Sequence, residues 1–239
     1  MTSPASIAEH LLIPVNQAIR RYSLIEDGDR IAVGVSGGKD SRPLLSLLVR
    51  GVDIPGDYVP VAIHVDGAHV GLPDRKSDLV PWFEDLGLAY EVVPMDVPKD
   101  EPLPMDCFRC AWNRRKTIFF AADRLDCNKV ALGHHADDAA VTMLLNLLYK
   151  GQMETLQPSL TYFNGRFDII RPLILTSEIE IARYARACGW LDNEAPACPQ
   201  EEETRRATLE RFLSTFSKPE REQIRANLWK LAHPDEEVP

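Results

Sequence analysis

The sequence predicts an α/β fold with a doubly wound, mostly parallel sheet and a small C-terminal helical extension. Short β-branched runs alternate with helical stretches, a pattern typical of parallel βαβ units. Polar or glycine-rich clusters directly follow three of these runs, at residues 36–41, 64–66 and 133–138. Ligands bind at the carboxyl ends of the strands in such sheets, so the three clusters are expected to form one site.

The first half of the chain contains the clearest strand and helix patterns. Residues 6–22 place apolar side chains on one helical stripe, and residues 30–35 (RIAVGV) form an apolar run expected to be a buried strand. A glycine turn follows, and Pro43 is acceptable in the first turn of the next helix. The further elements expected in this half are a strand at 58–65, a helix at 74–86 and a strand at 89–94.

The second half begins with a proline-bearing loop, residues 96–105, that leads into a helix expected from Cys107 to about Leu125. Asn164-Gly165 separates two strand-like runs, 160–163 and 167–170, and is a strong hairpin signal. The other elements expected here are a strand at 129–132 and helices at 139–149, 177–188, 204–216 and 220–232.

The length of 239 residues fits one large domain with an appendage, at roughly 150 residues per domain. We expect an N-terminal helix over 1–24, a main α/β domain over 25–198, which contains the three clusters, and a C-terminal helical extension over 199–239. No run approaches the roughly 20 apolar residues of a membrane helix. Glu9, His10 and Asn16 interrupt the N-terminal apolar stretch, so a secretory signal is not expected and a cytoplasmic location is.

The formal net charge of −9 argues against a surface that is basic all over. Residues 53–106 contain 12 acidic and 3 basic side chains, and the rest of the chain is neutral. The stretch 109–129 is basic, so an acidic protein could still present one basic face to a nucleic acid. The alternative is that these are ordinary solvated charges on a helix.

The most specific motif is the turn Ser36-Gly37-Gly38-Lys39-Asp40-Ser41 between an expected strand and an expected helix. Its glycines let the backbone approach a ligand closely, and N–H groups at a helix N-terminus attract an anion. Ser36 and Ser41 can donate hydroxyl hydrogen bonds, while Lys39 adds a full positive charge. The turn is therefore expected to bind phosphates, although it lacks the spacing of a Walker P-loop.

Five cysteines in a chain of this kind favour metal binding or catalysis over disulfides. Cys107 and Cys110 form a C-x-x-C pair, which brings two thiolates to one metal or one edge of a cluster. The alternative is a reducible pair or chance spacing. Candidates for a third ligand are Cys127, Cys188 and Cys198, and the loop position of Cys198 between two prolines suits a ligand best.

Two longer blocks carry a family resemblance. The block RIAVGVSGGKDS resembles the PP-loop ATP pyrophosphatases, which cleave ATP between the α- and β-phosphates. The block ALGHHADDAAVTMLLNLLY and the tripeptide RPL at 171–173 are similar to the tRNA thiolation branch of that superfamily. With the cysteine pair and Cys198, the best resemblance is to the tRNA-cytidine 2-thiolase family, over about residues 25–215. Arg42 and Pro43 depart from it, because a pair such as Tyr-Thr is expected after the loop.

The resemblance implies a set of site residues. The residues implied to bind ATP are Ser36, Gly37, Gly38, Lys39, Asp40, Ser41, His64, Val65, Asp66, Gly133 and His134. The residues implied to be catalytic are Lys39, Asp40, Arg114 and Asp138, and Asp138 would hold Mg²⁺ or orient the reacting base. The residues themselves leave alternatives open: Asp137 or Asp138 can cap a helix, and Asp66 can be an ordinary turn carboxylate.

The resemblance also implies a [4Fe-4S] cluster held by three cysteines, with one iron left without a protein ligand. On this chain the three are Cys107, Cys110 and Cys198, and either Cys188 or Cys127 could replace Cys198. Arg115 and Lys116 follow the cysteine pair and are expected to contact RNA. Among the tryptophans, only Trp112 lies where it could stack on a base.

The implied reaction is ATP-dependent sulfur transfer to a cytidine of tRNA. The C2 oxygen attacks the α-phosphate of ATP, pyrophosphate leaves, and sulfide then displaces AMP. Mg²⁺ and Lys39 would offset phosphate charge. The expected partners are tRNA, a sulfur donor such as a cysteine desulfurase or free sulfide, and a second copy in a homodimer. The alternatives are a related thiolase or desulfurase-like enzyme acting on another base or a small molecule, and a non-catalytic nucleotide- and cluster-binding sensor.

Overall fold

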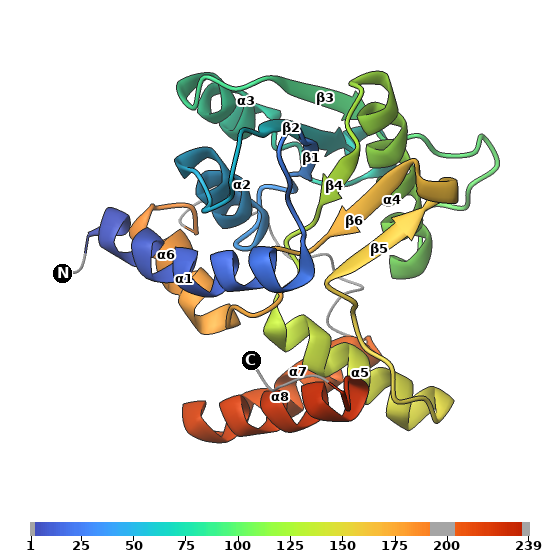
Figure 1. Cartoon of the computed structure of the whole chain (residues 1–239). Coiled ribbons are helices and arrows are strands. Elements are labelled where there is room, and N and C mark those ends of the chain that lie inside the picture. The colour runs from blue at the N-terminus through green and yellow to red at the C-terminus, as the bar shows by residue number, and fades with distance from the viewer. Residues whose placement is uncertain (1–2, 192–203, 236–239) are drawn as a thin grey trace.

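The computed structural model describes residues 3–191 and 204–235, and these residues form a six-stranded sheet with helices around it (Figure 1). The strand order is β3-β2-β1-β4-β6-β5, and every neighbouring pair is parallel except β5 with β6. The strands are β1 (Arg30–Gly34), β2 (Val59–Asp66), β3 (Tyr90–Pro94), β4 (Lys129–Ala131), β5 (Ser159–Tyr162) and β6 (Phe167–Ile170). The prediction of a mostly parallel, doubly wound sheet is confirmed.

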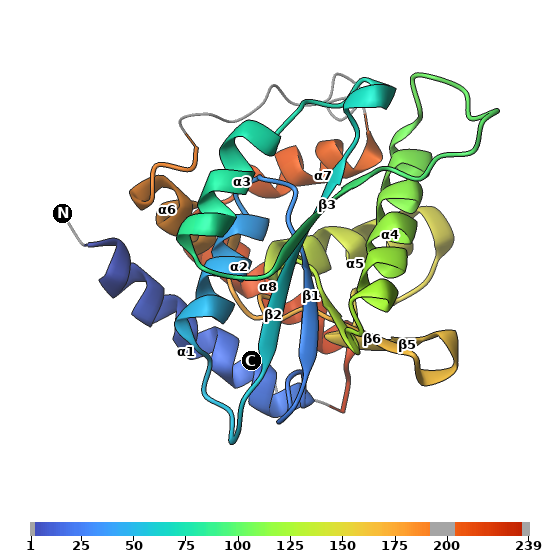
Figure 2. The same cartoon turned by 90° about the horizontal axis from the view of Figure 1, so that it is seen from above.

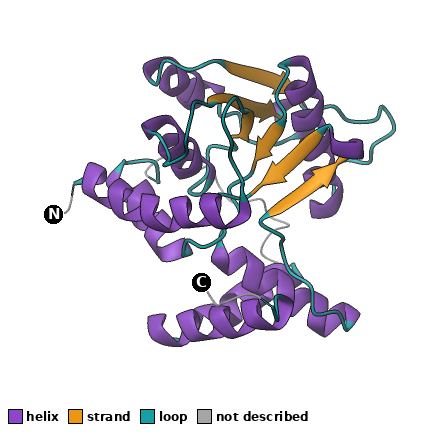
Figure 3. Cartoon of the chain, viewed as in Figure 1, coloured by secondary structure: helices purple, strands orange, loops and turns teal. Residues whose placement is uncertain are grey.

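The helices form two layers and a third group below the sheet (Figures 2 and 3). The eight α-helices of the described residues are α1 (Pro4–Tyr22), α2 (Ser41–Arg50), α3 (Lys76–Asp85), α4 (Cys107–Arg124), α5 (Ala136–Lys150), α6 (Glu178–Ala187), α7 (Arg205–Ser214) and α8 (Lys218–Ala232). Two 3₁₀ turns, η1 (Ala68–Val70) and η2 (Phe163–Gly165), interrupt the connections. None of the helices described is long and apolar enough to cross a membrane.

Alternation along the central strands sends apolar side chains to both faces of the sheet. Ile31 and Val33 of β1 pack against α1, α2, α3 and α6, whereas Ala32 faces α4 on the opposite side. Residues buried on both faces explain why β1 and β2 read as continuous apolar runs rather than alternating ones. The two helical layers therefore leave the strand ends open as the place for a site.

The C-terminal helices α7 and α8 pack on α5 instead of on the sheet. Leu209, Leu213 and Leu228 contact Val141 and Met143 in a separate apolar cluster. In Figure 1 this three-helix group lies below the strands, with α5 connecting the group to the sheet. The extension is thus attached to the helix that begins at the end of β4.

Two boundaries differ from the sequence prediction for identifiable reasons. Helix α5 was expected from Ala139 but begins at Ala136, because the His135 side chain accepts from the Asp138 N–H (3.4 Å) while Asp138 accepts from the His135 N–H (2.9 Å). This reciprocal capping box adds a helical turn. The strand expected at 160–163 ends at Tyr162, because Phe163 adopts a positive φ of 53°.

Candidate active site

The glycine turn after β1 is closed by its own hydroxyl groups. The N–H of Ser36 donates to Ser41 Oγ (3.2 Å), and the N–H of Gly38 donates to Ser36 Oγ (3.4 Å). Gly37 has a φ of +84°, and a Cβ on it would come within 2.9 Å of Arg75 Nε. Arg75 also donates to the Gly37 carbonyl (2.8 Å), so a side chain from the start of α3 fixes this turn.

The two sequence blocks meet through a second glycine. A Cβ on Gly133 would lie 3.2 Å from the carbonyl carbon and oxygen of Asp40, which is tighter than ordinary contact. A side chain at this position would push the Asp40 backbone away by a few tenths of an ångström, so the glycine lets the end of β4 approach residues 36–41, here called the phosphate turn, this closely. The prediction that residues 36–41 and 133–138 share one edge of the sheet is confirmed.

Lys39 lies between two carboxylates. Its ammonium is 3.0 Å from Asp40 Oδ2 and 3.0 Å from Glu178 Oε1 at the start of α6. Burial alone would lower the pKa of Lys39, but the two carboxylates outweigh it and raise the pKa above the ordinary value. Lys39 is therefore a fixed positive charge at the phosphate turn, and Glu178 is a site residue that sequence reasoning missed.

Two aspartates, one from each block, converge on His135. Its Nε2 lies 3.6 Å from Asp40 Oδ1 and 3.4 Å from Asp138 Oδ2. Burial raises the pKa of Asp40, and Lys39 and His135 only partly offset this rise. Burial would also raise the pKa of Asp138, but His135, Arg206 and His134 together hold it below the ordinary value. Asp138 is therefore ionised at neutral pH.

Asp40 and Asp138 offer the carboxylate oxygens that Mg²⁺ commonly binds when it is also bound to the phosphates of a nucleotide. Mg²⁺ commonly binds one or two carboxylates together with substrate phosphates, rather than a complete protein cage. Accordingly, no group of three or more His, Cys, Asp or Glu side chains within residues 3–191 and 204–235 is arranged to hold a metal alone. Asp40 and Asp138 fit an ion that arrives with ATP.

Arginines of the C-terminal helices reach both aspartates at the start of α5. Arg206 of α7 forms an ion pair with Asp138, and Arg225 of α8 contacts Asp137 at 2.8 and 3.0 Å. The second oxygen of Asp137 also accepts from the Glu178 N–H (2.8 Å). These arginines were missed because neither follows a strand nor belongs to a recognisable motif.

The residues at the end of β2 have structural partners. The buried His64 contacts the Val35 carbonyl through Nδ1 (2.8 Å), which ties β2 to the start of the phosphate turn. Asp66 accepts from the Ala68 N–H (3.0 Å) and from Lys76 Nζ (2.8 Å). These contacts show Asp66 serving as a turn carboxylate, and its predicted role toward ATP stays a prediction.

His134 is a neutral group beside the same turn. Burial lowers its pKa to about 4 despite the opposing charge of Asp138, and Arg171, Arg206 and Arg115 lower it further. Its Nδ1 is buried and meets no hydrogen-bond partner among the described residues. The imidazole therefore presents a polar atom without adding a positive charge.

Arg42, where the family resemblance predicts another residue type, is structural. Its side chain is buried, forms an ion pair with Asp78 of α3, and lies 5.3 Å from the ring centroid of Trp82. A cation over an indole ring adds attraction to the ion pair. The substitution thus joins α2 to α3 and leaves the phosphate turn unobstructed.

The C-x-x-C pair occupies the first turn of α4, which begins at the edge of the sheet that carries the phosphate turn (Figure 2). Cys107 is exposed and Cys110 is half-buried, with Arg114 donating toward Cys110 Sγ at 3.8 Å. Two ligands are therefore available to a metal cluster, while Cys198 lies outside the described residues.

The other two cysteines are placed elsewhere. Cys127 is completely buried against α4 and β4, and burial raises the pKa of its thiol. Cys188 caps the end of α6, where burial likewise raises its pKa. Figures 1 and 2 place α6 and α4 on opposite faces of the sheet. Neither thiol lies in the first turn of α4 with the C-x-x-C pair, and the assignment of Cys198 as the third ligand stays a prediction.

Most cations of the basic stretch are paired. Four of them contact carboxylates: Arg109 with Glu101 (2.5 Å), Lys116 with Asp96 (2.8 Å), Arg124 with Glu91 (2.6 Å) and Lys129 with Asp29 (2.9 Å). Arg114 and Arg115 have no carboxylate within 4.0 Å in the part of the chain that the structure describes. Phe108 and Trp112, 71% and 54% exposed, lie on the same helix. The basic surface of α4 that a nucleic acid could contact is therefore reduced to the region of Arg114 and Arg115, which is smaller than the sequence predicted.

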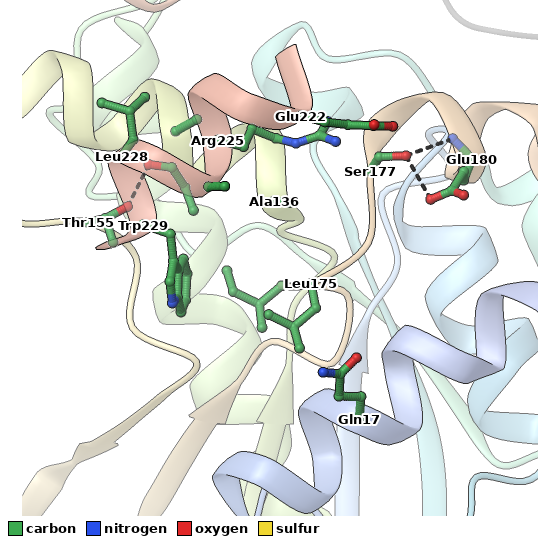
Figure 4. Close-up of a pocket in the computed structure, with 14 residues that line it drawn as sticks. Gln17, Ala136, Thr155, Leu175, Ser177, Glu180, Glu222, Arg225, Leu228 and Trp229 are labelled. Atoms are coloured by element: carbon green, nitrogen blue, oxygen red, sulfur yellow. Dashed lines mark hydrogen bonds between the residues drawn. The ribbon is translucent and has the colours of Figure 1, made fainter. Parts of the chain in front are cut away.

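A cavity of about 250 Å³ lies beside the start of α5, between α1, α6 and α8 (Figure 4). Ala136, Ser177 and Arg225 contribute to its wall, whereas no residue of the phosphate turn does. It is thus separate from the aspartate pair, and it lies on the side where α8 meets the rest of the molecule.

Comparison with known proteins agrees with this geometry. Residues 9–213 match the PP-loop domain family. A tRNA-cytidine(32) 2-sulfurtransferase from Anaeromyxobacter sp. (strain K) is 36% identical over 93% of this chain and 78% of its own length. The corresponding protein from Shewanella halifaxensis is 34% identical over 89% and 70%.

A solved structure, the U34-tRNA thiolase NcsA from Methanococcus maripaludis with its [4Fe-4S] cluster, superposes with a TM-score of 0.73. The match covers 96% of this chain and 81% of that one at 22% identity, so it establishes the common fold. The domain match and the sequence relatives establish more. The chain is a member of the PP-loop family and, within it, of the tRNA-cytidine(32) 2-sulfurtransferase family.

Proposed function

We propose that this protein is an ATP-dependent sulfurtransferase that replaces the C2 oxygen of a tRNA cytidine by sulfur. The observation that carries the proposal is the meeting of Lys39, Asp40 and Asp138 at one edge of the sheet, where the cysteine-bearing helix also begins. A phosphate site and a thiolate pair at a common edge suit a reaction that activates an oxygen with ATP and replaces it by sulfur. The relatives named for this activity support the same conclusion.

The residues of the phosphate turn bind and orient ATP. The backbone N–H of Gly37 and the N-terminus of α2 face the phosphates, and Lys39 offsets the charge that develops as pyrophosphate leaves. Asp40 and Asp138 hold Mg²⁺ against the same phosphates. The cytosine oxygen forms a bond to the α-phosphorus, the bond to the bridging oxygen breaks, and the pyrimidine is left with AMP as its leaving group.

The sulfur side of the site is formed by α4. Cys107, Cys110 and Cys198 would hold the [4Fe-4S] cluster, which would supply a Lewis-acidic iron without changing the net oxidation state of the base. Arg114, one turn after Cys110, lies where it can stabilise negative charge on the C2 position during displacement. A cysteine desulfurase or free sulfide supplies the sulfur. The proposal further places the protein in the cytoplasm and takes a homodimer as its active unit.

Nucleoside analysis tests the reaction directly. Digested tRNA from a strain that lacks this protein should lose 2-thiocytidine, and the wild-type protein should restore it while Asp138→Asn does not. The purified enzyme should form AMP and pyrophosphate in the presence of tRNA. Normal 2-thiocytidine in the deletion strain, or equal thiolation of a free nucleoside and of tRNA, would contradict the proposal.

The tRNA contact is expected to depend on Arg115. Each neutralised phosphate contributes roughly −0.7 to −0.9 to the slope of log affinity against log salt. Arg115→Ala should therefore flatten the slope by about one unit and weaken binding to all tRNAs alike. Lys116→Ala should change the slope less, because Lys116 already pairs with Asp96 at 2.8 Å.

Arg109→Ala is the matched control on the same helix, since Arg109 is held by Glu101. Filter binding or fluorescence anisotropy at several salt concentrations measures the slope. Arg114→Ala should lower turnover more than binding, because Arg114 lies beside Cys110. Binding of the wild-type protein that does not depend on salt would refute this account of the interface.

A further inference from the structure

Arg206 contacts the aspartate that is proposed to hold Mg²⁺. Its guanidinium forms an ion pair with Asp138 and, through Nε, with Glu210 one turn along α7 (2.8 Å). The other carboxylate oxygen of Asp138 accepts from the His135 N–H (2.9 Å). Each oxygen of Asp138 thus has one partner within the protein, and the partner on Oδ1 is a positive charge that a metal ion at that oxygen would meet.

The arginine is the partner that can leave. Asp138 is 15% exposed and is fixed by the capping box of α5, whereas Arg206 is 38% exposed and reaches the carboxylate from outside. A divalent ion and a guanidinium at the same carboxylate oxygen repel each other. Glu210 remains beside Arg206 as a second partner, so the arginine keeps a counter-ion after it leaves Asp138.

Lys39 is arranged in the same way on the other side of His135. Lys39 lies between Asp40 of the phosphate turn and Glu178 of α6, just as Arg206 lies between an aspartate of the site and a glutamate of an outer helix. Each cation is therefore held in place by one inner and one outer carboxylate. Lys39 is the phosphate ligand of the proposed function, and Arg206 is the corresponding cation beside Asp138.

The helix that packs beside α7, α8, borders the cavity described above. The cavity of about 250 Å³ in Figure 4 separates part of α8 from α1 and α6, and Arg225 lines it while contacting Asp137. Apart from the ion pairs and Arg205 over the ring of Tyr149, the contacts of α7 and α8 with α5 are those of the apolar cluster, which are non-directional. The partly exposed Arg206 side chain can leave Asp138 by its own rotation, with Glu210 as its remaining partner, while α7 and α8 stay docked on α5.

We propose that Arg206 is a displaceable cation that neutralises Asp138 in the nucleotide-free protein and moves onto the phosphates of ATP when Mg²⁺ takes Asp138. The inference rests on the proposed function, because it takes ATP as substrate and Asp138 as a metal ligand. Arginine suits the second role, since its planar fork binds phosphate oxygens through two parallel hydrogen bonds. The exchange prevents the metal from binding before the nucleotide.

Metal binding without nucleotide tests the first half of the exchange. Mn²⁺ titrations followed by electron paramagnetic resonance, on the full chain without ATP, should show about tenfold tighter binding to Arg206→Gln than to wild type. Arg205→Gln is the matched control, because Arg205 is the preceding residue on α7 and lies over the ring of Tyr149, away from the site. Adding Asp138→Asn to Arg206→Gln should abolish the gain. Equal Mn²⁺ affinity in wild type and Arg206→Gln would overturn the inference.

Binding of a non-hydrolysable ATP analogue with Mg²⁺ tests the second half. Calorimetry should show about tenfold weaker binding to Arg206→Gln, no change in Arg205→Gln and a smaller loss in Arg206→Lys, which keeps the charge without the fork. Unchanged affinity in Arg206→Gln would overturn the transfer to phosphate. If that variant does not fold, Arg206→Lys decides, because unchanged analogue affinity there would equally overturn it.

Neither assay needs tRNA, sulfide or an intact cluster, so its outcome is independent of thiolation. Failure of the exchange leaves 2-thiocytidine formation unaffected, whereas absence of 2-thiocytidine with a normal exchange would refute the proposed substrate alone. The two sets of measurements therefore distinguish an error about Arg206 from an error about the reaction.

Discussion

Lys39→Ala should lower the rate of AMP and pyrophosphate formation by about two to three orders of magnitude, as expected when one preorganised charge-stabilising donor is removed. The ammonium is held by Asp40 and Glu178 at 3.0 Å each, so it is in position before the nucleotide binds. Charge develops on the departing pyrophosphate in the transition state, and the loss should therefore appear mainly in turnover. Rapid-quench assays with labelled ATP measure both products.

Lys230→Ala is the control for this experiment, because Lys230 is an exposed lysine on α8. It should retain wild-type rates and the same thermal unfolding midpoint. Lys39→Ala is also expected to fold, since its ammonium contacts side chains at the site rather than the apolar core. Formation of ADP and phosphate in place of AMP and pyrophosphate would show that the phosphate turn does not support PP-loop chemistry in this chain.

The sequence predicted the sheet and the meeting of the two blocks because both depend on local patterns. Apolar runs such as 30–35 mark buried parallel strands, and clusters at the ends of parallel strands must share an edge. The close approach of Gly133 to Asp40 shows that the clusters after β1 and β4 do lie together at that edge. The hairpin around Asn164 was predicted for a similar reason, because turn chemistry lies within a few residues.

Long-range charge pairing could not be predicted in this way. Arg206 is 68 residues from Asp138, and nothing in the sequence around Arg206 distinguishes it from an ordinary solvated arginine. The pairing of Lys116 with Asp96 is likewise invisible, because it depends on how the loop before α4 folds back onto the helix. Composition alone therefore overstated the basic surface of α4.

The same pairing shows what the acidic stretch does. Several of its carboxylates are partners of basic side chains elsewhere, including Glu91 with Arg124 and Asp78 with the buried Arg42. The exposed pairs, such as Glu91 with Arg124, contribute little to the free energy of unfolding, typically below about 1 kcal/mol each. Their main consequence here is to neutralise α4 except around Arg114 and Arg115, beside the cysteine pair. The positive surface is thereby concentrated where the reacting base must lie.

Replacing any one of the three proposed cluster ligands should remove nearly all of the bound iron. Protein purified without oxygen should carry about four irons and four sulfides per chain, as in a cubane cluster. Cys107→Ala, Cys110→Ala and Cys198→Ala should each lose the iron and the charge-transfer absorbance near the visible region. A cluster with one open iron site cannot lose another of its three protein ligands and remain stably bound, so each loss should be nearly complete.

The two remaining cysteines provide the controls within the same chain. Cys127→Ala and Cys188→Ala should keep the full iron content, because Cys127 is buried under α4 and Cys188 lies at the end of α6 on the opposite face of the sheet. Iron and acid-labile sulfide assays on all five variants decide the ligand set. Loss of iron in Cys188→Ala with retention in Cys198→Ala would reassign the third ligand, and stoichiometric zinc in the anaerobic protein would exclude the cluster altogether.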